Sequence, residues 1–169
     1  MGTRLLIDRI ASPIGDVMIA VNEGDRMVLL DFDGNDDRID TLLRRYQGDH
    51  VRIDCDNPAG HSARIERYFQ GELDALDAIE VETGGTAFQR QVWAALRTIP
   101  VGTTATYGAI ASAVGRPTAS RAVGMTNGAN PVGIVLPCHR VVGANGTLTG
   151  YAGGLDRKQW LLRHEGALL

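Results

Sequence analysis

Cysteine is scarce in this sequence: Cys55 and Cys138 are the only two among 169 residues. Two thiols so far apart exclude a disulfide framework and a cysteine-rich zinc cluster. Long apolar runs are missing as well. No stretch approaches the roughly 18 apolar residues of a membrane span, and the first residues contain no apolar core of a secretory signal. We therefore expect a protein of the reducing cytoplasm, with no membrane partner.

Carboxylates are almost absent from the second half of the chain. Residues 83–169 hold seven arginines and one lysine against Asp156 and Glu165, a net charge of +6. Residues 1–82 hold nine arginines and no lysine against eighteen carboxylates, a net charge of −9. A basic half suggests contact with a polyanion such as nucleic acid. The alternative is that two solvated surfaces differ in charge.

The first 82 residues have the pattern of a small mixed α/β domain. His50, Cys55 and His61 are scattered through it and indicate no metal site, so we expect neither a metal nor a cofactor. A boundary is expected at residues 82–85, which gives domains of 1–82 and 83–169. Short apolar runs between turn residues predict strands at 5–7, 16–21 and 27–32, and helical spacing predicts helices at 38–46 and 58–69.

The second domain has the pattern of a helical DNA-binding module. Thr86 and Gln89 form a capping-box pattern at the start of a helix that we expect to end by Pro100. Two short helices follow, at 107–114 and 118–125, separated by a break at 115–117. Two short helices across a turn that contains glycine are typical of a helix-turn-helix. An ordinary αα-hairpin is the alternative.

The segment Pro137-Cys138-His139-Arg140-Val141 carries the clearest chemical signal. A thiol is a good nucleophile only as the thiolate, and a neighbouring imidazole is a common means of forming it at neutral pH. Taken alone, the pair could equally be a buried structural cysteine followed by a histidine.

Further residues place this segment in a known pattern. Tyr107, Arg121 and Asn130-Pro131 precede it, and Gly150-Tyr151-Ala152-Gly153-Gly154 and the run from Trp160 to Gly166 follow it. From about Thr86 to Gly166 the chain closely resembles the O6-alkylguanine-DNA alkyltransferases, also called methylated-DNA–protein-cysteine methyltransferases. The resemblance implies an α+β fold: a small mixed α/β N-terminal domain, then a mostly helical C-terminal domain with a helix-turn-helix, winged-helix-like DNA-binding motif.

For the chemistry, the resemblance implies a DNA repair enzyme that is used once. The alkyl group of an O6-alkylguanine, flipped out of the duplex, would pass irreversibly to Cys138. His139 would act as the base, and Glu165 would orient the imidazole and favour its charged form. Asn130 would brace the turn that leads to the cysteine strand.

The resemblance also assigns residues to DNA and to the base. Arg121 would enter the stack from the minor groove, and Tyr107 would crowd the target phosphate and donate a hydrogen bond toward the departing guanine. Val141 and Cys138 would read the guanine edge through their carbonyls, and Tyr151 and Ala152 would close the pocket. The remaining residues assigned to DNA binding are Arg116, Ala119, Ser120 and Arg140.

Three other classes share part of this pattern: alkyltransferase-like proteins that lack the reactive cysteine, cysteine hydrolases, and transcriptional regulators with a similar DNA-binding module. Only an alkyltransferase needs the Cys-His pair together with a helix-turn-helix in a basic half. We expect a monomer acting on double-stranded DNA. The sequence leaves open the preferred alkyl group, activity on O4-alkylthymine and cooperative assembly along DNA.

Overall fold

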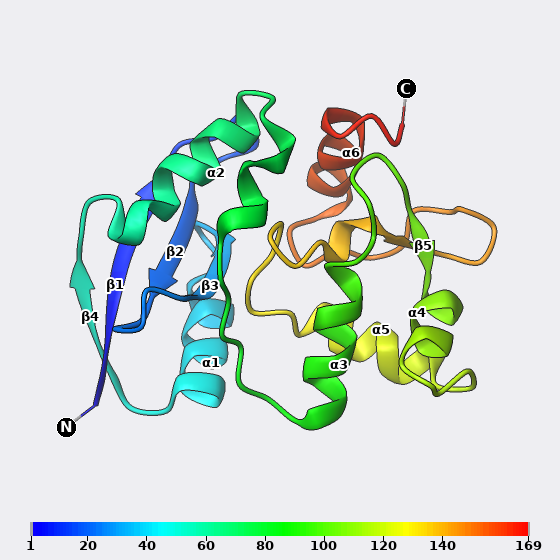
Figure 1. Cartoon of the computed structure of the whole chain (residues 1–169), viewed down its shortest axis with the longest axis horizontal. Helices are drawn as coiled ribbons and strands as arrows, with labels where there is room; N and C mark the ends of the chain where they lie inside the picture. The colour runs from blue at the N-terminus through cyan, green and yellow to red at the C-terminus, as the bar shows by residue number, and fades with distance from the viewer. Residues whose placement is uncertain (1, 169) are drawn as a thin grey trace. The chain divides into compact units, whose positions relative to one another are not determined.

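The computed structural model describes residues 2–168. The chain divides into two compact units, the first ending at Gly84 and the second beginning at Gly85. Figure 1 shows a sheet with helices in the first unit and mainly helices in the second. No helix within residues 2–168 has both the length and the apolar character needed to cross a membrane.

The first unit is built on a four-stranded sheet with the order β3-β2-β1-β4. β1 pairs antiparallel with β2 and parallel with β4, and β2 pairs antiparallel with β3. The three predicted strands are present, but β4 was missed. Its side chains are all at least partly exposed, so they lack the apolar alternation by which a half-buried strand is recognised. The strands are β1 (Thr3–Ile10), β2 (Val17–Val21), β3 (Met27–Phe32) and β4 (His50–Asp54).

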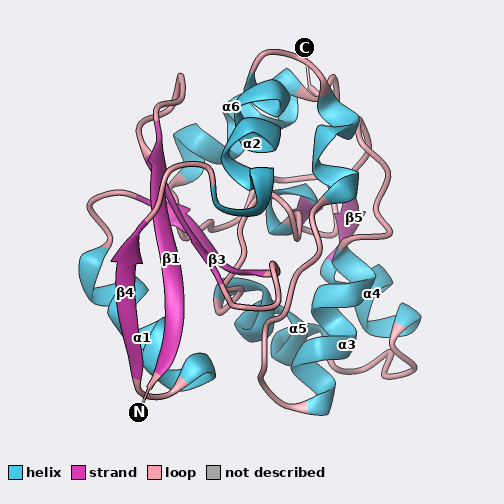
Figure 2. Cartoon of the chain, turned by 60° about the vertical axis from the view of Figure 1, so that its left-hand side comes forward, coloured by secondary structure: helices cyan, strands magenta, loops and turns pink. Residues whose placement is uncertain are grey.

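Helices cover both faces of this sheet. α1 (Asp36–Gln47) buries its apolar side in a cluster that contains Leu5 and Ile7 of β1. α2 (His61–Phe69) lies on the other face, where Ser62 Oγ donates to Asp8 Oδ2 at 2.6 Å. Successive side chains of a strand point to opposite faces, so the two helices enclose the sheet (Figure 2). β2 and β3 are consequently buried along their whole length.

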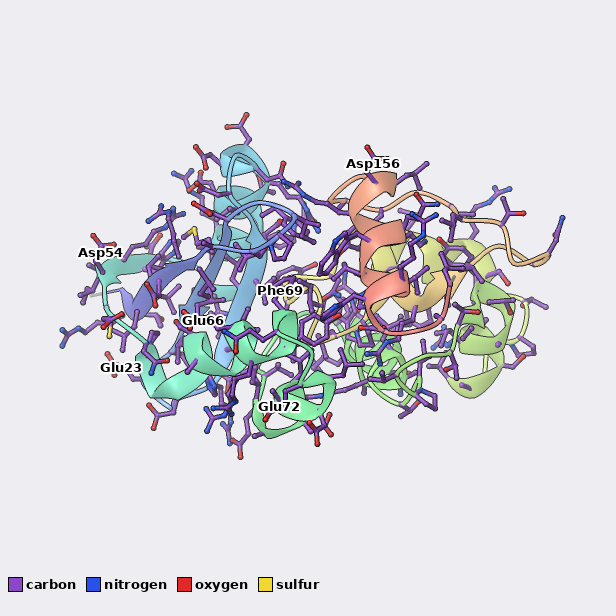
Figure 3. All side chains as sticks on the ribbon, turned by 90° about the horizontal axis from the view of Figure 1, so that it is seen from above. Glu23, Asp54, Glu66, Phe69, Glu72 and Asp156 are labelled. Carbon is purple, nitrogen blue, oxygen red and sulfur yellow. The ribbon has the colours of Figure 1, made fainter. Side chains whose placement is uncertain are left out.

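The predicted helix over 58–69 begins later than its sequence pattern suggests. A 3-10 turn, η1 (Pro58–Gly60), comes first, with Asn57 and Ala59 in the left-handed region at φ of 50° and 55°. A second 3-10 segment, η2 (Leu73–Ala78), follows α2. Most acidic side chains of this unit lie at its surface, as Asp54, Glu66 and Glu72 do in Figure 3, whereas Asp31 is buried.

The second unit opens with α3 (Ala87–Leu96), and both bonds of its capping box form. Gln89 N donates to Thr86 Oγ1 at 3.1 Å, and Thr86 N donates to Gln89 Oε1 at 3.0 Å. Gly85 precedes the cap at φ of 86°, and a Cβ there would lie 3.0 Å from the ring of Trp93. The helix ends at Leu96, before Pro100, where Thr98 N turns back to Ala95 O.

The helix-turn-helix consists of α4 (Tyr107–Ala113) and α5 (Ser120–Gly128). Thr106 caps α4 by accepting a hydrogen bond from Ala109 N at 3.0 Å. Trp93 of α3 holds α5 by donating from Nε1 to Thr126 O at 2.9 Å. α3, α4 and α5 therefore pack together, and α3 holds α5 in place through Trp93.

The rest of this unit carries the Cys-His segment. Cys138–Arg140 form a 3-10 turn, η3, and not the predicted cysteine strand. The strand starts just after it: β6 (Val141–Val142) pairs in parallel with β5 (Ala105–Thr106). α6 (Leu155–His164) follows. The predicted α+β class is confirmed.

Candidate active site

The turn before the nucleophile is strained and braced. Ile134, a fully buried β-branched residue, has a φ of 69°, which costs on the order of 1–3 kcal/mol and persists only where its surroundings enforce it. Asn130 supplies that restraint, because its Nδ2 donates to Leu136 O at 2.7 Å and its Oδ1 accepts from Val132 N at 2.9 Å. This geometry agrees with the bracing role predicted for Asn130.

Cys138 borders a cavity of about 390 Å³ in the second unit, although only 6% of the residue is exposed. Of the predicted residues, the structure brings Tyr107, Tyr151 and Ala152 to the same cavity. A larger hollow of about 650 Å³ in the first unit has a charged lining that includes Asp40 and Arg52 but no nucleophile. The complete lining of the Cys138 cavity is Tyr107, Gly124, Asn127, Gly128, Cys138, Gly150, Tyr151 and Ala152.

The two residues that follow the cysteine in η3 belong to a buried polar cluster of three side chains. His139 Nε2 contacts Glu165 Oε2 at 2.9 Å, and both side chains are fully buried. Glu165 also accepts two bonds from Arg140, from Nε to Oε1 at 2.8 Å and from Nη2 to Oε2 at 3.0 Å. The carboxylate thus has two partners, a bidentate guanidinium and an imidazole, and only the guanidinium carries a permanent charge.

Taken together, the surroundings of His139 favour the neutral imidazole, although Glu165 favours the charged form, as predicted. Burial lowers the pKa of His139 below its ordinary value of 6.5, against the opposing effect of Glu165, and the charges of Arg140 and Lys158 lower it further. Because a carboxylate only accepts, the imidazole hydrogen sits on Nε2. Nδ1 is buried with no partner among the described residues, which leaves its lone pair available as a base.

Arg140 is the counter-ion of Glu165, and its predicted contact with DNA stays a prediction that its burial does not favour. Only 6% of the residue is exposed, and its remaining terminal nitrogen donates to Ile99 O at 2.7 Å. Each of the three guanidinium nitrogens therefore donates a hydrogen bond inside the protein. Arg140 thereby fixes the position of the Glu165 carboxylate.

Lys158 is a buried cation that interacts with Cys138 and was not predicted from the sequence. The residue is 0% exposed, and Nζ donates to Val141 O at 2.6 Å and to Thr149 O at 3.1 Å. Burial lowers the pKa of Lys158 from 10.5, and the charge of Cys138 opposes that shift. Coulomb attraction is mutual, so the ammonium favours the thiolate. One feature of the sequence could have drawn attention to Lys158: it is the only lysine in the chain.

The predicted DNA contacts lie on the helix-turn-helix. Arg121 is exposed in the first turn of α5, and Ala119 and Ser120 stand at the start of that helix. Arg116 is exposed in the turn between the helices, with its guanidinium 5.3 Å from the ring centre of Phe88. The guanidinium of Arg116 therefore makes a cation–π contact with Phe88 while the residue stays exposed.

The two remaining predicted substrate contacts have partners inside the protein. The hydroxyl of Tyr107, at the start of α4, lies 2.6 Å from Thr149 Oγ1. The carbonyl of Val141 already accepts from Lys158, and it has a second lone pair. Within residues 2–168, no three His, Cys, Asp or Glu side chains group together as metal ligands would. His50 and His61 bond instead to Gly48 O and Asp25 O.

Comparison with known proteins bears directly on this arrangement. Residues 87–167 match the family described as 6-O-methylguanine DNA methyltransferase, DNA binding domain, and residues 6–83 match its ribonuclease-like domain. A methylated-DNA–protein-cysteine methyltransferase of Salmonella typhimurium is 51% identical over 169 residues, 98% of each chain. The chain belongs to the O6-methylguanine DNA methyltransferase family. The resemblance predicted from the sequence is confirmed.

Solved members of the methyltransferase family share the fold. Mycobacterium tuberculosis OGT in complex with DNA is 38% identical with a TM-score of 0.79, over 97% of this chain and 93% of that chain. The O6-methylguanine-DNA methyltransferase of Pyrococcus kodakaraensis strain KOD1 is 29% identical with a TM-score of 0.70, over 96% and 99%. Both similarities extend over both units of this methyltransferase-family chain.

The buried carboxylate leads to a prediction for this methyltransferase. Glu165→Gln leaves the Arg140 charge buried without its counter-ion, and breaking such a pair costs about 3–5 kcal/mol. We expect that loss in the free energy of unfolding, measured by urea denaturation. Arg163→Gln, on the exposed side of α6, should change it by less than about 0.5 kcal/mol. Equal effects of the two substitutions would contradict the role given to Glu165.

Lys158 leads to a prediction about pH. A lysine whose pKa is lowered begins to lose its charge at a lower pH than a free lysine does. The electrostatic stabilisation of the Cys138 thiolate by Lys158 should therefore decrease as the pH rises. In a Cys55→Ser background, Lys158→Met should slow iodoacetamide alkylation of Cys138 at pH 7 by about tenfold, which corresponds to one pKa unit. The alkylation profile should also move to higher pH. An unchanged profile would show that Lys158 serves packing alone.

Proposed function

We propose that this protein repairs DNA by transferring an alkyl group from O6 of an alkylated guanine to Sγ of its own Cys138. The observation that carries the proposal is the position of Cys138, at the edge of a base-sized cavity and in front of the buried His139–Glu165–Arg140 cluster. A buried base behind a nucleophile at a cavity edge is the arrangement that covalent transfer requires.

The transfer begins with loss of the thiol proton to His139. The proton moves, through a bridging water, to Nδ1, which Glu165 keeps free by holding the hydrogen on Nε2. The imidazolium formed is stabilised by the same carboxylate, and Lys158 supports the thiolate. His139 is therefore neutral at rest and charged only after it has accepted the proton, which is the state a general base needs.

The bond changes follow from in-line displacement. A bond forms from Sγ to the alkyl carbon while the carbon–O6 bond breaks, and its electron pair leaves with the guanine. The Tyr107 hydroxyl, released from Thr149, donates a hydrogen bond toward the departing base and stabilises its charge. Tyr151 and Ala152 cover the base, and the carbonyls of Cys138 and Val141 read its edge.

DNA is bound through the helix-turn-helix, and the target nucleotide is flipped into the cavity. Arg121 fills the position that the base leaves, and Arg116 contacts phosphate. The protein acts as a monomer on double-stranded DNA, in the cytoplasm, where thiols stay reduced. No group near Cys138 can expel a thioether, so each molecule reacts once.

The first test concerns Cys138 and stoichiometry. Incubation with a duplex that carries O6-methylguanine should place one methyl group on the peptide that holds Cys138, detected by peptide mass mapping. Product should level off at about one per protein, since a thioether is a poor leaving group. Cys138→Ser should abolish transfer and retain binding to the lesion. Repeated turnover, or a methyl group on Cys55, would disprove the proposal.

The second test concerns Arg121. By filling the gap in the stack, this side chain offsets an unstacking cost of a few kcal/mol. Arg121→Ala should therefore slow single-turnover repair of duplex DNA far more than reaction with free O6-benzylguanine. Arg116→Ala should instead weaken binding to all sequences and lower the slope of log affinity against log salt by about 0.9. Equal losses on duplex and free base would exclude the assigned role of Arg121.

A further inference from the structure

The hydroxyl of Tyr107 has a single hydrogen-bond partner within residues 2–168, and no role has yet been given to that partner. Thr149 Oγ1 lies 2.6 Å from the Tyr107 oxygen, so one hydrogen lies between the two atoms. Either hydroxyl can be the donor, because each carries one hydrogen and two lone pairs. The direction of this hydrogen bond is therefore set by what else the two groups contact.

The backbone of Thr149 is held in place on both sides. Its carbonyl oxygen accepts from Lys158 Nζ at 3.1 Å, and the same Nζ donates to Val141 O at 2.6 Å. The turn that precedes it is closed by Gly143 N, which donates to Thr147 O at 2.9 Å. A Cβ on Gly143 would lie 3.3 Å from Thr149 Cγ2, so the chain passes close to this glycine. A fixed backbone therefore presents the Thr149 hydroxyl to Tyr107.

The transfer reaction decides which hydroxyl donates. When Tyr107 donates toward the departing guanine, its hydrogen turns away from Thr149. The Tyr107 oxygen keeps its lone pairs, and the hydrogen of the Thr149 hydroxyl can then occupy one of them. A hydroxyl that accepts a hydrogen bond becomes a stronger donor, because the two bonds polarise each other. The contact between Tyr107 and the charge that develops on the base is thereby strengthened.

We propose that Thr149 is a positioning residue for the leaving group, whose hydroxyl donates to the Tyr107 oxygen while Tyr107 donates to the guanine. The inference rests on the proposed function of the site. Thr149 does not belong to the lining of the Cys138 cavity, so its effect on the base passes through Tyr107. Lys158 thus serves both sides of the reaction, because it supports the thiolate and fixes the residue that supports the leaving group.

The test compares two electrophiles that react with the same sulfur. The guanine of an O6-methylguanine duplex leaves with the help of Tyr107, whereas iodoacetamide expels iodide, which needs no hydrogen-bond donor. Thr149→Val keeps the shape of the side chain and removes its hydroxyl. It should slow single-turnover transfer about fivefold to tenfold, the range of one hydrogen bond. In a Cys55→Ser background, it should leave iodoacetamide alkylation of Cys138 unchanged.

Three further variants separate this role from packing. Thr149→Ser retains the hydroxyl and should restore the transfer rate. In a Tyr107→Phe background, Thr149→Val should cause no further loss, because two residues that act as one unit are not additive. Thr147→Val is the matched control, since Thr147 is an exposed threonine of the same loop, and it should change neither rate.

Two results would overturn the inference: unchanged transfer by Thr149→Val, and slowing of transfer and alkylation by the same factor, which would make Thr149 a support for the surroundings of the cysteine. A full further loss from Thr149→Val in the Tyr107→Phe background would do so as well, because the effect would then not pass through the phenol. Absence of transfer by the unmodified protein would instead refute the proposed function, and the inference with it.

Discussion

The rest of the second unit depends on the contacts that the buried Glu165 carboxylate makes. It joins the last turn of α6 to the 3-10 turn that holds the nucleophile, through Arg140 on one side and His139 on the other. A buried anion requires a buried cation. Arg140 meets that requirement, and His139 is left neutral. One charge pair therefore fixes the position of the turn, while burial lowers the pKa of His139 and keeps the base neutral.

A second buried cation, Lys158, complements this pair. Lys158 is held by two backbone carbonyls, and its charge faces a thiol that becomes negative during the reaction. The site therefore divides the two tasks of activation. The imidazole removes the proton, and the ammonium stabilises the charge that remains. An imidazolium at rest could have done only the second.

Much of this arrangement could be predicted from the sequence because it rests on local patterns. The capping box at Thr86, the helix pair around Gly115 and the Cys138-His139 segment are each encoded by neighbouring residues. β4 could not be predicted, because an edge strand with exposed side chains has no apolar alternation. Nor could the fate of Arg140, because its burial depends on a carboxylate 25 positions away. The position of Lys158 likewise depends on the backbone carbonyls of Val141 and Thr149, which are distant from it in the sequence.

The burial of Cys138 bears on how long an unused molecule lasts. A reagent that is consumed in one event is wasted whenever a diffusing oxidant or electrophile reaches its sulfur first. Only 6% of Cys138 is exposed, whereas Cys55 in the first unit is more accessible. Oxidation is selective for thiols that solvent can reach. The residues around the cavity therefore protect the Cys138 sulfur from oxidants and electrophiles until a base that fits the cavity enters.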